Sequence, residues 1–558
     1  MKVTLRTILN ATIKQNSKVL ATGFAIACLV GTTSTAFAQQ DNIVIPPGAD
    51  GVTITNPQGG SILATGNAIR TSADTEIQNA GLIDGGVNGV NFVNGLGSGI
   101  LTNQGTGVIQ SDSRAVNIGG SVILTNQGLI LGTGDQRNGT VYSDSVANNF
   151  SINNSGTIDA GAGNQGSGIG LEIGALTNAT ITNTGVIQGR TNLPAVSGSS
   201  GASGDGLRLA NFGPLGPGET RSFVGSILNG SGGLISSESN SDTIAGFRVG
   251  NNIGFQGTLQ NDGAITGPRN GVYFGTGDHT GGIVNNSGTI SSDSRALNID
   301  GQGLTVNNTG TIAATGLQRN GTVYVDGTAD NFTINNSGSI DASGGAGSGL
   351  SVQVGSFDGD VVNGSIQNSG LIEGAGQGSL DAGIRFFTST AESTFSGNIL
   401  NLQGGVLTGG ENSAAVLFDS ETSFDGSLIN QGLIDGSVFL NDGDAIFTDI
   451  SILELEVSSL DEFESVETLG LVAFDGILDI SFDDGFIPFV GQTFDLFDFS
   501  VSTGQFDEIR ADGVVFDTSN LGSQGSLTVL SAVPEPSALA IIGFGSVFIL
   551  TRRRRRDD

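Results

Sequence analysis

Short runs of alternating apolar and polar residues, separated by Gly, Asn and Ser, fill most of the chain from residue 39 to residue 440. The run Ile77–Ile83 reads apolar, polar, Asn, any residue, Gly, apolar, apolar, and variants of this phrase recur. The Asn residues of its thirteen copies are Asn79, Asn103, Asn126, Asn154, Asn183, Asn229, Asn261, Asn286, Asn308, Asn336, Asn368, Asn401 and Asn430. Their spacing is 22 to 33 residues, with one gap of 46 after Asn183. Periods of about 20 to 50 residues are typical of solenoids.

A second strand-like phrase lies between the Asn copies, as in Ala115–Ile118 and Gly271–Phe274. Alternation with a period of two, bounded by Gly, Asn and Ser, predicts short β-strands. No helical period of useful length appears outside the two terminal segments. We therefore predict an all-β fold, a parallel β-helix (β-solenoid) over residues 39–440. With about 13 coils at ~4.8 Å each, the solenoid would be about 60 Å long.

The Asn-x-Gly phrases are predicted to form the corners of the coils. Gly is expected to take a positive φ there, and Asn to tolerate it or to bond its own backbone. One coil cannot bury its apolar side alone, so neighbouring coils must cover it. Equivalent Asn side chains of stacked coils are then expected to form a hydrogen-bonded ladder, as amides do in cross-β assemblies.

A larger duplication is superimposed on the short repeat. Ser111–Ala115 returns as Ser292–Ala296, and Gln136–Tyr142 returns as Gln318–Tyr324. The offset is 181 to 183 residues, so a block of several coils was copied whole. The segment Thr191–Arg221, rich in Gly, Ser and Pro, lies in the 46-residue gap and is predicted to be an inserted loop or irregular coil.

The composition of the sequence changes at about Asn441, where the Asn-x-Gly phrases stop. Residues 441–530 contain 19 acidic residues and one basic residue, Arg510. Alternation persists, as in Ile477–Phe482. We predict that residues 441–531 form an acidic, β-rich end module that caps the open edge of the solenoid, which would otherwise invite strand addition.

The N-terminus has the three parts of a secretory signal peptide. Basic residues between Lys2 and Lys18 precede the apolar run Val19–Gly31, and small residues typical of a signal-peptidase cleavage site follow. We predict that residues 1–38 are a signal peptide, read by the secretion machinery and removed by signal peptidase. The residues expected to define the cleavage site are Ala36, Ala38 and Gln39.

The C-terminal tail, residues 532–558, also has three parts. Pro534, Glu535 and Pro536 precede the apolar stretch Ala538–Leu550, and a basic tract of Arg552, Arg553, Arg554, Arg555 and Arg556 follows. Thirteen residues of helix cover only ~20 Å of a ~30 Å hydrocarbon core, which favours a transient membrane helix. The Arg tract is expected to stay on the cytoplasmic side as a basic lock.

This tail resembles the PEP-CTERM sorting signal, in which Pro534, Glu535 and Pro536 match the motif that gives the family its name. The resemblance implies transient anchoring in the inner membrane, processing by an exosortase-like membrane protease, and release to the cell surface or the extracellular polymer matrix. It covers only the tail. In the body, the segment Gly491–Phe497 resembles the end segments of autotransporter-like and adhesin-like repeat proteins.

Charge narrows the range of partners. Between Lys18 and Arg552 lie 12 basic residues, all Arg, and 51 acidic residues, a net charge of −39. Such a surface repels nucleic acids and anionic lipid head groups, so no nucleic-acid partner is expected. The single cysteine, Cys28, lies in the signal peptide, so the mature chain has no thiol for a disulfide.

The sequence offers little for catalysis, and we predict no enzymatic activity, no catalytic residue and no cofactor. Acidic residues such as Asp84, Asp435 and Asp442 precede Gly and are expected at turns, and His279 is the only histidine. Arg114 and Arg295 occupy equivalent places in the duplicated block, as do Arg137 and Arg319. They are expected to pair with Asp112 and Asp293 or to be exposed, with binding of an acidic sugar as the alternative. No metal site is assigned, although calcium at the acidic end module stays open.

These observations together favour a structural or adhesin-like β-solenoid of the cell surface or extracellular matrix, in contact with extracellular polysaccharide or a neighbouring surface. One alternative is a carbohydrate-active β-helix enzyme, a polysaccharide lyase or hydrolase, which would need paired carboxylates or Ca²⁺ with a basic residue. The other is an autotransporter-type passenger, which would need a C-terminal membrane domain for which the Arg-ended tail leaves no room.

Overall fold

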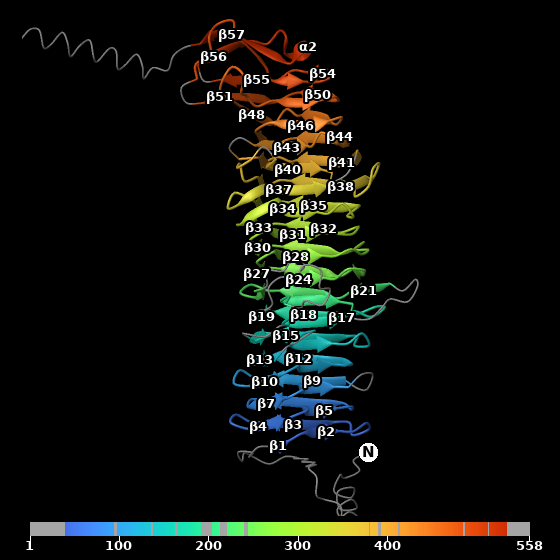
Figure 1. The fold of residues 1–558 in the computed structure, drawn as a ribbon. Coiled ribbons are helices and arrows are strands. Elements are labelled where there is room, and N and C mark those ends of the chain that lie inside the picture. Colours follow the sequence, from blue (N-terminus) through green and yellow to red (C-terminus); the bar gives the residue numbers. More distant parts are fainter. Residues whose placement is uncertain are drawn as a thin grey trace, which may run out of the picture.

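The computed structural model describes residues 40–532, except 94–97, 135–137, 162–165, 191–203, 212–219, 239–243, 379, 389–391, 411–412, 484–485 and 512. In this part the chain winds into a straight stack of coils from β1 at one end to β57 at the other (Figure 1). Almost all regular structure is β-strand, and every coil adds one strand to each of three long parallel sheets, A, B and C. The predicted parallel β-helix is therefore confirmed.

Sheet A has 18 strands that pair in parallel from coil to coil. They are β1 (Gln40–Asp41), β4 (Ser61–Ala64), β7 (Leu82–Gly85), β10 (Val108–Ser111), β13 (Leu129–Gly132), β16 (Thr157–Asp159), β19 (Val186–Gly189), β23 (Leu234–Ser237), β27 (Ala264–Gly267), β30 (Thr289–Ser292), β33 (Thr311–Ala314), β36 (Ser339–Asp341), β39 (Leu371–Glu373), β42 (Val406–Thr408), β45 (Leu433–Asp435), β48 (Ile452–Val457), β51 (Ile477–Phe482) and β55 (Glu508–Ala511).

Sheet B has 17 strands. They are β2 (Ile43–Ile45), β5 (Asn67–Thr71), β8 (Asn88–Phe92), β11 (Arg114–Ile118), β14 (Val141–Ser143), β17 (Ile169–Glu172), β20 (Leu207–Ala210), β24 (Ala245–Val249), β28 (Asn270–Phe274), β31 (Arg295–Ile299), β34 (Leu317–Val325), β37 (Ala346–Gln353), β40 (Ala382–Phe387), β43 (Ala414–Phe418), β46 (Val438–Asn441), β49 (Val466–Thr468) and β53 (Phe497–Asp498).

Sheet C also has 17 strands, most of which end at an Asn of the repeat. They are β3 (Val52–Asn56), β6 (Thr75–Asn79), β9 (Ser98–Asn103), β12 (Ser121–Asn126), β15 (Phe150–Asn154), β18 (Ala179–Asn183), β22 (Ser226–Asn229), β26 (Thr258–Asn261), β29 (Ile283–Asn286), β32 (Thr305–Asn308), β35 (Phe332–Asn336), β38 (Val361–Asn368), β41 (Ser393–Asn401), β44 (Thr422–Asn430), β47 (Asp444–Phe447), β50 (Leu471–Phe474) and β54 (Val501–Gly504).

The core is a set of apolar rows that run along the stack. In sheet A the strand register places one inward aliphatic residue of each coil directly above that of the coil before. Its first members are Ile62, Ile83, Ile109, Ile130, Ile158 and Ile187, all buried. Burial of each such side chain contributes about 1.5–3 kcal/mol. The alternation in the sequence thus becomes a thin continuous core that no single coil could form.

The winding extends further than the repeat phrase does. Coils continue past residue 440 through β48, β51 and β55, where Phe447 of β47 follows Asn430 in register. The non-coil part is smaller: β52 (Thr493–Asp495), β57 (Ser526–Ala532) and β56 (Val514–Asp517) form an antiparallel sheet, accompanied by the short α2 (Leu521–Gln524). We call this antiparallel sheet the cap. The phrase stops earlier because Phe replaces Asn at the corner while the strand alternation persists.

The predicted insertion is only partly irregular. Within Thr191–Arg221, Leu207–Ala210 form β20, a regular member of sheet B. β21 (Arg221–Phe223) pairs with β25 (Ile253–Phe255) beside the main sheets.

The two terminal segments stay predictions. The signal-peptide residues Ala36, Ala38 and Gln39, the motif Pro534–Pro536 and the tract Arg552–Arg556 lie outside the described residues. In residues 40–532, as far as they are described, no helix is long and apolar enough to cross a membrane.

Candidate functional site

The Asn residues of the repeat form one buried row at the corner between sheets C and A. The Nδ2 of each Asn donates to the Oδ1 of the Asn in the next coil, over 2.7–2.9 Å. The row contains Asn56, Asn79, Asn103, Asn126, Asn154, Asn183, Asn229, Asn261, Asn286, Asn308, Asn336, Asn368, Asn401 and Asn430. Asn56 has no Asn-x-Gly phrase, and sequence reasoning missed it. The Thr-Ile-Thr-Asn alternation of β3 is the signal that could have found it.

Asn286 illustrates the unit of this ladder. Its Oδ1 accepts from Asn261 at 2.7 Å, and its Nδ2 donates to Asn308 Oδ1 at 2.7 Å. The same Nδ2 lies 3.3 Å from the carbonyl oxygen of Gly288 and 3.2 Å from that of Thr311 in the next coil. Each amide therefore joins three layers and adds a second donor to corner carbonyls such as that of Gly288, which also accepts the Thr311 backbone N–H at 2.9 Å.

The corner glycines serve a different purpose from the one predicted. Gly288 and Gly310 are not among the residues with positive φ, so the expectation of a left-handed backbone at these corners is wrong. A Cβ on Gly310 would lie 2.2 Å from the carbonyl oxygen of Gly288, and one on Gly288 would lie 2.1 Å from that of Gly263. Glycine is required here because the corners of successive coils stack backbone on backbone.

Four described arginines of sheet B lie over aromatic rings on the outer side of the sheet. The guanidinium carbon lies 3.8 Å from the ring centroid in the pair Arg114–Tyr142, 4.1 Å in Arg295–Tyr324, 4.9 Å in Arg385–Phe387 and 5.6 Å in Arg248–Tyr273. Each Arg covers an aromatic residue of the following coil or its own strand, and the tyrosine rings are buried. Contacts of this kind contribute about 0.5–2 kcal/mol each. They support the outer face of the sheet.

This arrangement differs from the predicted pairing of Arg114 with Asp112 and of Arg295 with Asp293. Among the described residues neither ion pair is formed, and Asp112 accepts instead from Thr133 Oγ1 at 2.8 Å. Arg114 Nη1 donates to Asn117 Oδ1 at 3.2 Å. Arg137 and the side chain of Arg319 lie outside the described residues.

A polar cluster on sheet B is centred on Asp300, just after β31. Tyr273 donates its hydroxyl to Asp300 Oδ2 at 2.7 Å. Burial, with the nearby Asp326 carboxylate, raises the pKa of Asp300 to about 7, against the opposing effect of Arg295 and Arg248. A carboxyl group that titrates near neutrality beside a second carboxylate is the kind of pair that acid–base chemistry uses. Structural networks produce the same shift.

The outer side of sheet A carries a row of carboxylates in consecutive or near-consecutive coils. Asp341 and Glu373 are register partners, and so are Asp435, Glu454 and Asp479, which end against Arg510. Asp84 and Asp435 lie in strands β7 and β45, so their predicted turn positions are wrong. Close to this row, burial raises the pKa of Glu464 to about 7.

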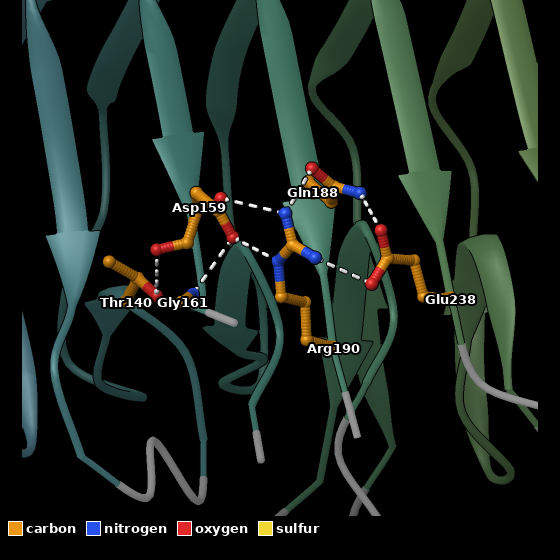
Figure 2. Close-up of polar contacts among 6 residues, drawn as sticks. All are labelled: Thr140, Asp159, Gly161, Gln188, Arg190 and Glu238. Carbon is orange, nitrogen blue, oxygen red and sulfur yellow. Dashed lines mark hydrogen bonds and ion pairs between the residues drawn. The ribbon is translucent and has the colours of Figure 1, made fainter. Parts of the chain in front are cut away.

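Farther along the same sheet, Arg190 ties three coils together (Figure 2). Its Nε and Nη2 bind both oxygens of Asp159 at 2.7 and 3.0 Å, and its Nη1 binds Glu238 Oε2 at 2.5 Å. Gln188, between them, accepts from Arg190 and donates to Glu238 Oε1 at 2.7 Å. The hydrogen bond to Asp159 raises the pKa of Arg190. This network fixes the strand ends next to residue 191.

His279 is buried at a coil corner rather than displayed on a surface. Its Nδ1 accepts the Phe255 backbone N–H at 3.1 Å, and its Nε2 lies 2.9 Å from the Gly275 carbonyl oxygen. The ring is therefore neutral with the proton on Nε2, and burial lowers its pKa. Its hydrogen bonds are structural ones. In the part of the chain that the structure describes, no group of three or more His, Cys, Asp or Glu side chains is arranged to hold a metal ion.

Comparison with known proteins adds one finding. Residues 532–556 match the model of the PEP-CTERM protein-sorting motif. The motif implies that the chain is exported, sorted in association with the membrane, and processed by an exosortase. No curated protein matches the chain.

Proposed function

We propose that the mature chain is a structural, adhesin-like rod of the cell surface or extracellular matrix, delivered there through its PEP-CTERM tail. The observation that carries this proposal is the Asn ladder, which runs through fourteen coils. Such a device holds many layers in one register, which suits a mechanical role. At ~4.8 Å per layer, seventeen coils give a rod about 80 Å long.

The partner that suits this rod is extracellular polysaccharide or a neighbouring surface. The face of sheet B supports this, because polar and aromatic side chains occupy one outward register position in consecutive coils, as in Arg208, Arg248, Tyr273 and Asn298. The duplicated block places the same Arg–Tyr stack twice, with Arg114 over Tyr142 and Arg295 over Tyr324.

We further propose that the rod has no catalytic activity and needs no cofactor. His279 is enclosed and its nitrogens bond the backbone, which leaves it no catalytic reach. Among the described residues, the Asp300 and Asp326 pair is an arrangement that favours the alternative, a carbohydrate-active enzyme. Incubation with a panel of acidic and neutral polysaccharides tests this. Depolymerisation that the Asp300→Asn variant abolishes would replace the structural proposal with the enzymatic one.

The sorting step is tested by the combined Glu535→Ala and Pro536→Ala variant in the native host. We expect this variant to remain with the membrane fraction and the wild type to be released with a shortened C-terminus, as mass spectrometry would detect. Asp557→Ala, which lies outside the matched residues 532–556, is the control and should behave as the wild type. Release of wild-type protein with an intact tail through Asp558 would refute the processing.

A further inference from the structure

The cap leaves a group of large apolar side chains uncovered. Ile487, Phe489, Val490, Val515 and Leu530 have exposed fractions of 55–68 %. Side chains such as Leu527 and Val529, which alternate with Leu530 along β57, are buried against the solenoid. We call the five exposed residues the cap patch. Neighbouring exposed apolar residues of this size are unusual on a soluble surface and indicate a binding surface.

The cap patch surrounds the point where the chain leaves the cap. The Gly491 N–H donates to the Val529 carbonyl oxygen at 2.8 Å, which brings Val490 beside the last residues of β57. On the other side of β57, Val514 and Val515 pair with Ala532 and Ser531. Val490, Val515 and Leu530 thus come from three segments that meet around the end of β57, and β57 lies near the top of the stack (Figure 1).

The length of chain after Ala532 limits how far the patch can lie from a membrane. The apolar stretch of the sorting tail begins at Ala538, six residues further on. Six residues span at most about 20 Å when fully extended. When that stretch enters a bilayer, the six-residue connection holds the patch within about 20 Å of the head groups and of the apolar boundary below them.

We propose that the cap patch docks on the lipid surface of the membrane while the sorting tail is still attached. This inference rests on the proposed sorting function and adds a second membrane contact to it. The lipids that fit are zwitterionic, because Asp483, Asp495 and Glu508 are exposed on the same end of the rod and repel anionic head groups. Docking would hold the chain between Ala532 and Ala538 close to the interface, within reach of a membrane protease.

The chain contains no tryptophan, so one introduced residue gives a unique fluorescence signal. We would reconstitute the full chain carrying Phe489→Trp into phosphatidylcholine vesicles and compare it with Phe357→Trp. Phe357 is 75 % exposed and lies in the solenoid, between β37 and β38, far along the chain from the cap. We expect Phe489→Trp emission to shift to the blue and to be quenched at least two-fold by lipids brominated near the head group. Phe357→Trp should change in neither respect.

The outcomes separate the two proposals. If the chain floats with the vesicles and Phe489→Trp is no more quenched than Phe357→Trp, the docking is refuted and the sorting proposal stands. If the chain does not float with the vesicles, the membrane premise fails, and the docking fails with it. A blue shift that appears without lipid and grows with protein concentration would assign the patch to contact between two copies, and would also overturn the docking. Circular dichroism of both variants checks that the solenoid is intact.

Discussion

Removal of one amide from the ladder tests the physical basis of the fold most directly. Asn286→Ala deletes a buried side chain whose Oδ1 and Nδ2 bond Asn261 and Asn308. Asn308 Oδ1 then loses the donor that satisfies it, while Asn261 Nδ2 keeps only its bond to the Thr289 carbonyl oxygen at 3.0 Å. The carbonyl oxygens of Gly288 and Thr311 also lose a donor.

The magnitude follows from these groups. Each buried polar group left without a partner costs about 1–3 kcal/mol, and Asn308 Oδ1 becomes such a group, while Asn261 Nδ2 loses one of its two bonds. We expect Asn286→Ala to lower the free energy of unfolding by about 2–5 kcal/mol. Asn285, the preceding residue of β29, is the matched control. It faces outward, is half-buried and accepts one bond from Asn307 at 2.9 Å, so solvent can replace what Asn285→Ala removes. We expect that change to cost no more than about 1 kcal/mol.

The assay must report locally, because stacks of repeats unfold with incomplete cooperativity. Hydrogen exchange followed by mass spectrometry gives protection in β29, β32 and β26, and guanidinium unfolding followed by circular dichroism gives the global midpoint. Asn286→Ala should lose protection in these three strands and Asn285→Ala should not. Equal effects of the two substitutions on protection and midpoint would refute the view that the ladder, rather than the strands alone, holds the corner.

Further outcomes are expected from the same geometry. Gly310→Ala should destabilise the stack by about 1–3 kcal/mol or more, because its Cβ would meet the Gly288 oxygen at 2.2 Å; Gly105→Ala, with open space around its Cβ, should be tolerated in the same denaturation assay. The pKa values of Asp300 and Glu464 are raised to about 7, above their unfolded values, so their stabilising effect is complete below about pH 4 and is lost as the pH rises through 7. We expect the free energy of unfolding to be larger at pH 6.5 than at pH 8.5 by about 1 kcal/mol per group, which raises the thermal midpoint at pH 6.5, and we expect Asp300→Asn to remove its share. A midpoint that rises with pH would contradict this. His279 does not disturb that comparison, because its lowered pKa costs stability only as the pH falls below 6.5.

The sequence predicted the parts of the fold that repeat. Thirteen of the fourteen ladder residues follow from one phrase, because each coil needs the same buried Asn at its corner. Asn56 was missed since Pro57 follows it and the phrase is altered. The end of the winding was also misplaced, because Phe447 fills the corner position after Asn430 and keeps the coil without the marker.

Contacts between coils were the least predictable feature. The stacking of Arg114 on Tyr142 joins residues 28 positions apart, and only the strand register brings them together. Local charge instead suggested Asp112, which is two residues away along the chain. The need for glycine at the corners was unpredictable for the same reason. A Cβ there would collide with the backbone of the preceding coil, whereas the φ of the glycine itself is not positive.

The duplicated block separates what the fold requires from what the surface is free to change. Across the 181 to 183-residue offset the ladder is retained, with Asn79, Asn126 and Asn154 matched by Asn261, Asn308 and Asn336. The outer row of sheet B is not retained in the same way. Asn91, which accepts from Asn117, has Tyr273 as its counterpart, and Gly119 has Asp300. A change at the corner removes buried hydrogen bonds to both neighbouring coils, whereas a change on the outer face of sheet B alters contacts between side chains at the surface. The differences that distinguish one copy from the other, and any selectivity for a partner, should therefore be sought on sheet B and not at the ladder.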